Sequence, residues 1–134
     1  MLKAKDVMTR RIFTVTKSTP IYEAVELAVE KGISAMPVVA EDMSLAGILS
    51  EKDLIRLVHE EEATENKTVS DFMTQPAISF EQDENLLDVC DFLMKNIFRR
   101  VPITSNGRLV GIISIRDILE YVLDRRRQSA GKSE

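Results

Sequence analysis

Two four-residue stretches of this chain combine a hydroxyl, a basic group and a carboxylate in the same order. Residues 50–53 read Ser-Glu-Lys-Asp and residues 114–117 read Ser-Ile-Arg-Asp. At the start of a helix, free backbone N–H groups favour an anion, the basic side chain neutralises phosphate, and the carboxylate can accept hydrogen bonds from ribose hydroxyls. The candidate residues are Ser50, Lys52, Asp53, Ser114, Arg116 and Asp117.

The same spacing also has a purely structural explanation. Ser-x-x-Asp at a helix start forms a capping box, in which the serine side chain caps the helix and the aspartate reaches back to the serine N–H group. By itself the pattern is more often a cap than a binding site, although serine can serve both roles. Gly47 and Gly111 stand three residues before the serines. They either permit a close backbone approach or relieve packing.

Both stretches belong to a sequence that occurs twice. The offset between the copies is 65 residues up to the prolines and 64 after them, so the second copy lacks one loop residue. A duplication of this kind is a structural repeat. Two such units can pair about a pseudo-twofold axis and create two similar clefts, where we expect the function to lie. The matching segments are residues 6–9 and 71–74 (Asp-x-Met-Thr), 36–39 and 101–104 (x-Pro-Val/Ile-x), and 45–53 and 109–117.

Hydrophobic periodicity predicts the order β-α-β-β-α in each copy, and therefore an α/β fold. The first helix begins near Pro20, with Ser18 or Thr19 as its cap, and ends at Gly32. Asn106-Gly107 favours a type I′ hairpin turn in the second copy. The expected strands are 12–15, 36–40 and 45–50 in the first copy and 77–80, 101–104 and 109–114 in the second.

The repeat divides the chain into four expected segments. The first copy covers residues 1–62, a polar linker 63–67, the second copy 68–124, and a polar tail that frays from the last helix 125–134. Each copy has about 60 residues, a size at which a single core is marginal. We therefore expect the copies to stabilise each other.

Composition points to a globular protein of a reducing cytoplasm. Of the 134 residues 44% are hydrophobic and 30% charged, and no apolar run reaches the length of a membrane span. The N-terminus lacks the apolar stretch of a signal peptide. A single cysteine excludes an internal disulfide. The net charge of −4 does not favour nucleic acid.

No catalytic or metal-binding set of residues stands out, so we expect neither an enzyme nor a metal site. His59 lacks a nucleophilic partner, and one histidine and one cysteine cannot build a zinc site. Cys90 falls on the apolar face of a helix and is interpreted as a small core residue. The remaining features are interpreted as core packing (Met8, Met73, Met94), a solvated acidic run (Glu60, Glu61, Glu62) and a basic tail (Arg125, Arg126, Arg127).

The repeated order Asp-x-Met-Thr, helix, x-Pro-Val/Ile, Gly-Ile-x-Ser-x-x-Asp resembles a pair of cystathionine-beta-synthase (CBS) domains, often called a Bateman module. The resemblance covers roughly residues 3–123. It implies a stand-alone regulatory module that holds an adenosine-containing ligand between the repeats and signals to a separate effector protein. The implied ligands are AMP, ADP or ATP, with Mg²⁺ accompanying ATP, or S-adenosylmethionine. The alternative is a protein or nucleic-acid interaction module without a nucleotide ligand.

The resemblance also implies two composite sites and favours a binding role for Asp53 and Asp117. Arg99 and Arg100, whose counterparts are Ser34 and Ala35, would stand at the mouth of one site and reach a phosphate; the alternative is an exposed, solvating pair. Apolar residues from the other copy would hold adenine, or else are ordinary core. The Ser114 site would borrow Ile12, Phe13 and Ile33, and the Ser50 site Ala77, Ile78 and Phe98.

The resemblance to CBS modules also implies a homodimer, in which two modules pair through their helices into a flat disc. The sequence offers independent support, because the last helix of each copy is apolar over more than one face. The surplus surface favours an isologous dimer over an exposed patch. The alternative is a monomer in which both faces are used internally. The apolar residues are Leu54, Ile55, Leu57 and Val58, and Ile115, Ile118, Leu119, Tyr121, Val122 and Leu123.

Overall fold

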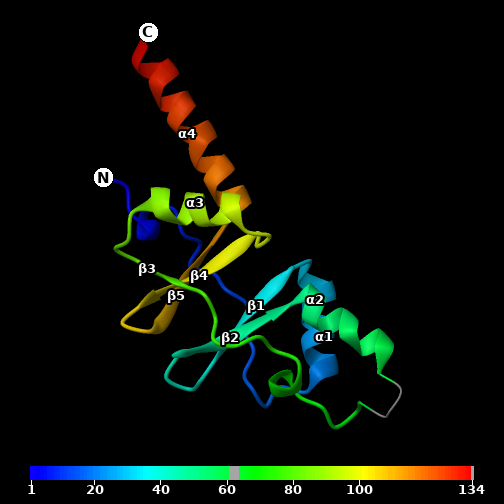
Figure 1. The fold of residues 1–134 in the computed structure, drawn as a ribbon. Helices are drawn as coiled ribbons and strands as arrows, with labels where there is room; N and C mark the ends of the chain where they lie inside the picture. The colour runs from blue at the N-terminus through cyan, green and yellow to red at the C-terminus, as the bar shows by residue number, and fades with distance from the viewer. Residues whose placement is uncertain (61–63, 134) are drawn as a thin grey trace. The chain divides into compact units, whose positions relative to one another are not determined.

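The computed structural model describes residues 1–60 and 64–133, which form two compact α/β units (Figure 1). The terminal unit consists of Met1–Ile12, Ser79–Asn106 and Val110–Glu134, and the central unit of Phe13–Ile78 and Gly107–Leu109. Each unit therefore combines parts of both sequence repeats. Residues 61–63, where the first repeat was expected to meet the linker, and Glu134 lie outside the described residues, and the predicted segment limits stay predictions.

The central unit is built on a hairpin of β1 (Ala35–Val39) and β2 (Leu45–Ser50). The two strands pair antiparallel, as the spacing predicts. Val15, at the end of the expected strand 12–15, adds a single parallel bridge to Val38. Its N–H group donates to the Pro37 carbonyl at 3.1 Å, so this piece is an extended segment pinned at one residue rather than a strand.

The terminal unit contains the three-stranded sheet, except for residues 108–109, which are grouped with the central unit. Its strands lie in the order β3 (Phe80–Glu81), β4 (Arg100–Ser105) and β5 (Arg108–Ser114), with β3 parallel to β4. Asn106 and Gly107 join β4 to β5 with φ values of 53° and 80°. Positive φ at both turn positions is what a type I′ turn requires, so the turn prediction is confirmed.

Helices follow the predicted pattern, with differences at two ends. Pro20 occupies the N-cap position of the first helix without a side-chain cap, and the Thr19 hydroxyl instead accepts the Thr16 N–H group at 3.0 Å. The predicted Ser18 or Thr19 cap is therefore wrong. The helices described are α1 (Ile21–Lys31), α2 (Glu51–Ile55), α3 (Leu86–Lys95) and α4 (Ile115–Ser133), with 3-10 turns at Ala4–Asp6, Arg56–His59 and Val69–Asp71.

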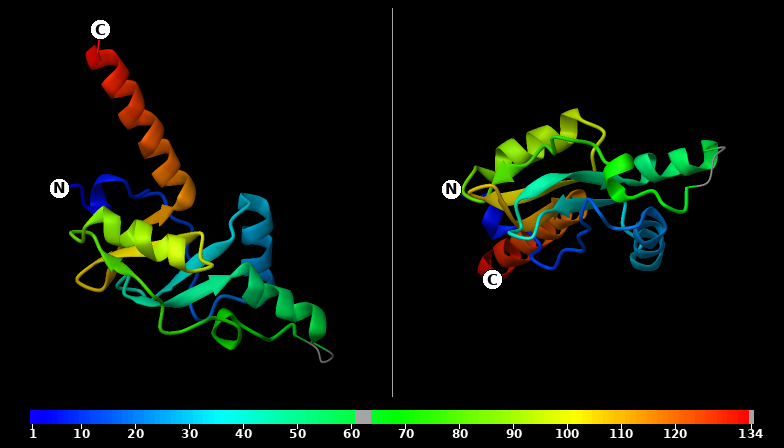
Figure 2. Two further views of the ribbon diagram at one scale, coloured as in Figure 1. Left: turned by 45° about the horizontal axis from the view of Figure 1, so that its top comes forward. Right: turned by 90° about the horizontal axis from the view of Figure 1, so that it is seen from below.

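The last helix is longer than expected. Residues 125–133 continue α4 and extend beyond the rest of the terminal unit (Figure 2), so the prediction of a frayed tail is wrong for these residues. No helix in the described part of the chain is long and apolar enough to cross a membrane.

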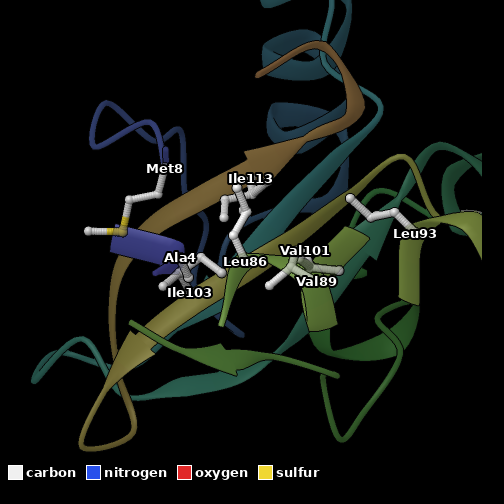
Figure 3. Packing of buried hydrophobic residues seen from close by; sticks show 8 residues of the cluster. All are labelled: Ala4, Met8, Leu86, Val89, Leu93, Val101, Ile103 and Ile113. Carbon is white, nitrogen blue, oxygen red and sulfur yellow. The ribbon is translucent and has the colours of Figure 1, made fainter. Parts of the chain in front are cut away.

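Each unit has a core of its own, and both cores draw on both repeats. Residues 4–8 of the first repeat pack with the sheet and α3 of the terminal unit (Figure 3), while residues 69–72 of the second repeat pack in the central unit. Met94, predicted as core, is 75% exposed. The terminal core is Ala4, Met8, Leu86, Val89, Leu93, Val101, Ile103 and Ile113; the central core is Val15, Ile21, Ala24, Met36, Val38, Leu49, Val69 and Phe72.

Candidate functional site

The repeats exchange their Asp-x-Met-Thr segments. Thr9 forms an antiparallel bridge with Ile112, in which the N–H of Thr9 donates to the Ile112 carbonyl at 2.8 Å and the reverse bond measures 2.9 Å. Thr74 forms the equivalent bridge with Ile48, with both bonds at 2.9 Å. In each unit, the threonine of one repeat therefore lies beside the Ser-x-x-Asp turn of the other.

Asp117 joins these two motifs in the terminal unit. Its Oδ2 atom accepts the Ser114 N–H at 2.9 Å, and the Ser114 hydroxyl accepts the Asp117 N–H at 3.1 Å. The Thr9 hydroxyl donates to Oδ1 at 3.0 Å. Each carboxylate oxygen has two lone-pair positions, so Asp117 keeps acceptor capacity after these bonds are made.

Asp53 repeats the arrangement in the central unit with a weaker tether. Its Oδ2 atom accepts the Ser50 N–H at 2.9 Å, and the Ser50 hydroxyl accepts the Asp53 N–H at 3.2 Å. The Thr74 hydroxyl lies at 3.3 Å from Oδ1. The capping-box interpretation therefore describes both turns, while the binding role of the two aspartates stays a prediction.

Thr9 and Thr74 were missed as partners of the aspartates. Both close an Asp-x-Met-Thr motif at the same place in the repeat. The sequence thus carries a signal, because a threonine at the same position in both copies, directly after an apolar pair, indicates a hydrogen-bonding role. Which aspartate it meets depends on long-range pairing and is not visible in local periodicity.

The glycines of the Gly-Ile-x-Ser motif allow this close approach. A Cβ atom added to Gly47 would lie 2.7 Å from the Thr74 carbonyl oxygen, a distance that real Cβ atoms do not tolerate. A Cβ atom on Gly111 would collide with the side chain of Met8. The structure supports close backbone approach at Gly47, whereas Gly111 makes room for the Met8 side chain, which is the packing explanation.

Replacing Gly47 with alanine is expected to lower the free energy of unfolding by about 1–3 kcal/mol, the usual cost of overpacking. The backbone of the 73–75 segment must move, since the atom in the way is a carbonyl oxygen rather than a flexible side chain. Chemical denaturation measures the loss. Gly131→Ala is the control, because its added Cβ meets nothing within 4 Å beyond its chain neighbours and the backbone of its own helix. Equal stability of Gly47→Ala and the parent would contradict the prediction.

Basic residues gather beside the Ser114 turn. The Arg99 carbonyl accepts the Ile115 N–H at 2.9 Å, which fixes Arg99 next to the start of α4. Arg100 is half-buried, and its buried Nε atom has no hydrogen-bond partner in the described part of the chain. Arg116 is 87% exposed and pairs with Glu120 at 3.1 Å. In the central unit, Ser34 takes the place of Arg99, and the Ser34 carbonyl accepts the Glu51 N–H at 2.8 Å. Lys52 is exposed.

The apolar candidates divide between the units. Ile12 shares the terminal unit with Asp117, and Ala77 and Ile78 share the central unit with Asp53. The other three belong to the opposite unit from the aspartate to which they were assigned, and their role stays a prediction. The Lys31 ammonium lies 5.3 Å from the centroid of the Phe13 ring. Ile33 packs on the central core. Phe98 stacks on Phe92, with the ring centroids 5.8 Å apart, and is 41% exposed.

The other titratable groups show no reactive arrangement in the described residues. Cys90 is half-buried beside the terminal core, and burial raises the pKa of its thiol, which disfavours the nucleophilic thiolate. His59 is exposed. Within residues 1–60 and 64–133, no group of three or more histidine, cysteine, aspartate or glutamate side chains is placed to hold a metal ion; Glu61 and Glu62 of the acidic run lie outside this part.

The family model of the CBS domain matches the chain twice, at residues 4–60 and 69–124. The chain belongs to the CBS domain family. The two matches fall on the two sequence repeats, and the mixed α/β architecture, with two sheets and their helices, is that of a CBS pair. The resemblance that the motifs carry is therefore confirmed as family membership.

Relatives of this CBS protein include chains of similar and of greater length. Protein YlbB of Bacillus subtilis is 31% identical over 88% of this chain and 80% of its own length. Uncharacterized protein MJ1225 of Methanocaldococcus jannaschii is 32% identical over 88% of this chain, which spans only 42% of that relative.

Two solved CBS-pair structures contain adenosine compounds. CBSX2 of Arabidopsis thaliana, crystallised with AMP, has 30% sequence identity and a TM-score of 0.86 over 94% of this chain and 99% of its own. The CBS pair of MJ0100, in complex with 5′-methylthioadenosine and S-adenosylmethionine, has 25% identity and a TM-score of 0.78 over 92% of this chain and 98% of its own. CBS pairs of this fold can therefore bind ligands that contain adenosine.

Proposed function

We propose that this CBS pair is a non-catalytic regulatory module that binds an adenine nucleotide beside its Ser-x-x-Asp turns and signals to an effector protein. The observation that carries the proposal is the setting of Asp117. Its carboxylate is held by Ser114 and Thr9 with acceptor capacity left over, and Arg99 and Arg100 adjoin the same turn. Such a site offers hydrogen bonds to a ribose and cations to a phosphate.

AMP, ADP and ATP, the last with Mg²⁺, are the proposed ligands, with S-adenosylmethionine as a further candidate. Thermal unfolding with each compound tests the proposal, because a ligand that binds only the folded state raises the Tm. Failure of all four compounds to shift the Tm would favour the alternative, an interaction module without a nucleotide. Turnover of a nucleotide during incubation would contradict the non-catalytic assignment. A cytoplasmic location also stays a prediction.

Arg100→Ala is expected to lower the affinity for ATP more than the affinity for AMP. The wild-type terminal site offers the two adjacent arginines for additional phosphates, whereas the equivalent positions of the central unit are Ser34 and Ala35. We therefore expect the terminal site to be the tighter one. Isothermal titration of both nucleotides into the wild type and the variant measures the two ratios. Equal losses for AMP and ATP would mean that Arg100 does not contact the additional phosphates.

A homodimer is the proposed assembly. The helices expected to pair retain exposed apolar side chains: Ile55 and Val58 are 59% and 81% exposed, and Leu119 and Val122 on α4 are 59% and 56% exposed. Covering such surface favours association. Light scattering at micromolar concentration is expected to give twice the 15.1 kDa chain mass. A mass equal to that of one chain would refute the dimer.

A further inference from the structure

A groove in the terminal unit lies between the N-terminal segment and α4. Its volume is about 420 Å³, within the range of ordinary ligand pockets. It touches only Asp117 among the residues proposed for nucleotide binding. The lining residues are Leu2, Asp6, Val7, Thr9, Asp117, Glu120, Tyr121, Asp124, Arg125 and Gln128.

The charge of the groove is strongly negative. Three carboxylates besides Asp117 line it, from Asp6, Glu120 and Asp124, against the single cation of Arg125. Among the described residues, Glu120 and Asp124 form ion pairs with exposed arginines of α4 itself, at 3.1 and 3.5 Å, and such surface pairs hold their partners weakly. The groove therefore repels phosphate and favours a cation.

The internal repeat provides a second, independent observation about the occupant. At the equivalent place in the central unit, the Arg56 guanidinium lies 5.1 Å from the centroid of the Phe72 ring. Its Nη2 atom donates to the Asp71 carbonyl at 3.3 Å. An arginine of the chain itself therefore occupies this place in the central unit, by a cation–π contact and a hydrogen bond.

The terminal unit has a glutamate where the central unit has Arg56. With the repeat offsets of 64 and 65, the counterpart of Arg56 is Glu120, and the counterparts of Asp71 and Phe72 are Asp6 and Val7. The aromatic ring of the terminal groove is provided instead by Tyr121, the counterpart of Leu57. The groove thus combines carboxylates and an aromatic ring around a place where the other unit holds a guanidinium.

We propose that this groove docks an arginine side chain of a partner protein. The guanidinium would take the place that Arg56 takes in the central unit, paired with the carboxylates of Glu120 and Asp124 and flanked by Tyr121. The inference does not require a bound nucleotide, so its failure leaves the proposed nucleotide site untouched, and the converse also holds.

Nuclear magnetic resonance titration of the nucleotide-free, isotope-labelled protein tests the proposal. The probe is N-acetyl-arginine amide, and its neutral isostere N-acetyl-citrulline amide is the control ligand. We expect the arginine probe to shift the backbone amides of Val7, Thr9, Glu120 and Tyr121, and the citrulline probe to bind about tenfold more weakly, as loss of a charged hydrogen bond predicts. Absence of these shifts, or equal binding of the two probes, overturns the proposal.

A variant that restores the arginine of the other repeat sharpens the test. Glu120→Arg should fill the groove from within and abolish probe binding, whereas Glu26→Arg, the same charge change at an exposed position of α1, should leave it unchanged. Asp124→Asn keeps the shape of the side chain and should weaken binding of the arginine probe less than Glu120→Arg does. Binding that persists in Glu120→Arg, or that falls equally in Glu26→Arg, overturns the assignment of the groove.

Discussion

Replacing Phe72 with alanine is expected to lower the free energy of unfolding by about 3–5 kcal/mol, the usual cost of truncating a buried phenylalanine. The Phe72 side chain is only 2% exposed and belongs to the core of the central unit. Its removal leaves a cavity in a close-packed interior and also removes the ring beneath Arg56. Urea denaturation followed by circular dichroism measures the change.

The location of the lost stability in Phe72→Ala tests which elements Phe72 packs against. Phe72 belongs to the second repeat in sequence, yet it shares a core with Ile21, Met36 and Leu49 of the first. Hydrogen exchange of Phe72→Ala should therefore show lost amide protection in α1, β1 and β2. These elements precede the substitution by more than 20 residues, so a local effect along the chain cannot produce the pattern.

Val7→Ala provides the matched control, because Val7 is the counterpart of Phe72 in the first repeat. Val7 is half-buried against the terminal core, and its truncation should cost about 1–2 kcal/mol. The loss of protection should then fall on α3, β4 and β5. If Phe72→Ala instead weakened α3 and β4, the 69–72 segment would pack with its own repeat, and the exchange of segments would be wrong.

The hairpins and helices could be predicted because their signals are local. Short apolar runs around Pro37 and Pro102, Gly32 after the first helix, and Asn106-Gly107 between two strands each depend on a few neighbouring residues. The structure has all of these features. The continuation of α4 to Ser133 also has a local signal, although the polarity of residues 125–133 favours a tail. Three successive arginines, glutamine and alanine are good helix formers, even where no core stripe is present.

The exchange of the Asp-x-Met-Thr segments could not be predicted in this way. Nothing in residues 6–9 or 71–74 states whether they pair with the nearer or the farther Gly-Ile-x-Ser strand. The two motifs are so similar that either pairing satisfies the same hydrogen bonds. The choice is made by packing: Phe72 fits the central core, and Met8 lies against Gly111 in the terminal unit. The two sequence repeats therefore do not correspond to the two compact units, because each unit contains segments of both repeats.

Replacing Asp117 with alanine is expected to lower nucleotide affinity about tenfold or more. A hydrogen bond to a charged group contributes roughly 1.5–3 kcal/mol, and about 1.4 kcal/mol corresponds to a factor of ten. The variant also loses the bonds from the Ser114 N–H group and the Thr9 hydroxyl, so the start of α4 should lose on the order of 1 kcal/mol of stability. Calorimetric titration of the folded variant measures the affinity.

Two further variants separate ligand binding by the Asp117 carboxylate from its role in capping α4 and holding Thr9. Thr9→Val removes the hydroxyl that donates to Asp117 Oδ1 at 3.0 Å but keeps the carboxylate. If Asp117 binds ribose directly, Thr9→Val should retain most of the affinity, since the freed oxygen can accept a ligand hydroxyl. Asp117→Asn keeps the shape and one acceptor oxygen, and its affinity should lie between those of the wild type and the alanine variant.

The outcome that would reject the binding role is specific. Asp53 has the same cap and a longer bond from Thr74, at 3.3 Å, so Asp53→Ala should affect the central site as Asp117→Ala affects the terminal one. If both alanine variants lost stability but neither lost affinity, the aspartates would be helix caps and tethers only. A loss of affinity as large in Thr9→Val as in Asp117→Ala would place the effect in the tether, because the two variants share only the broken bond between the repeats.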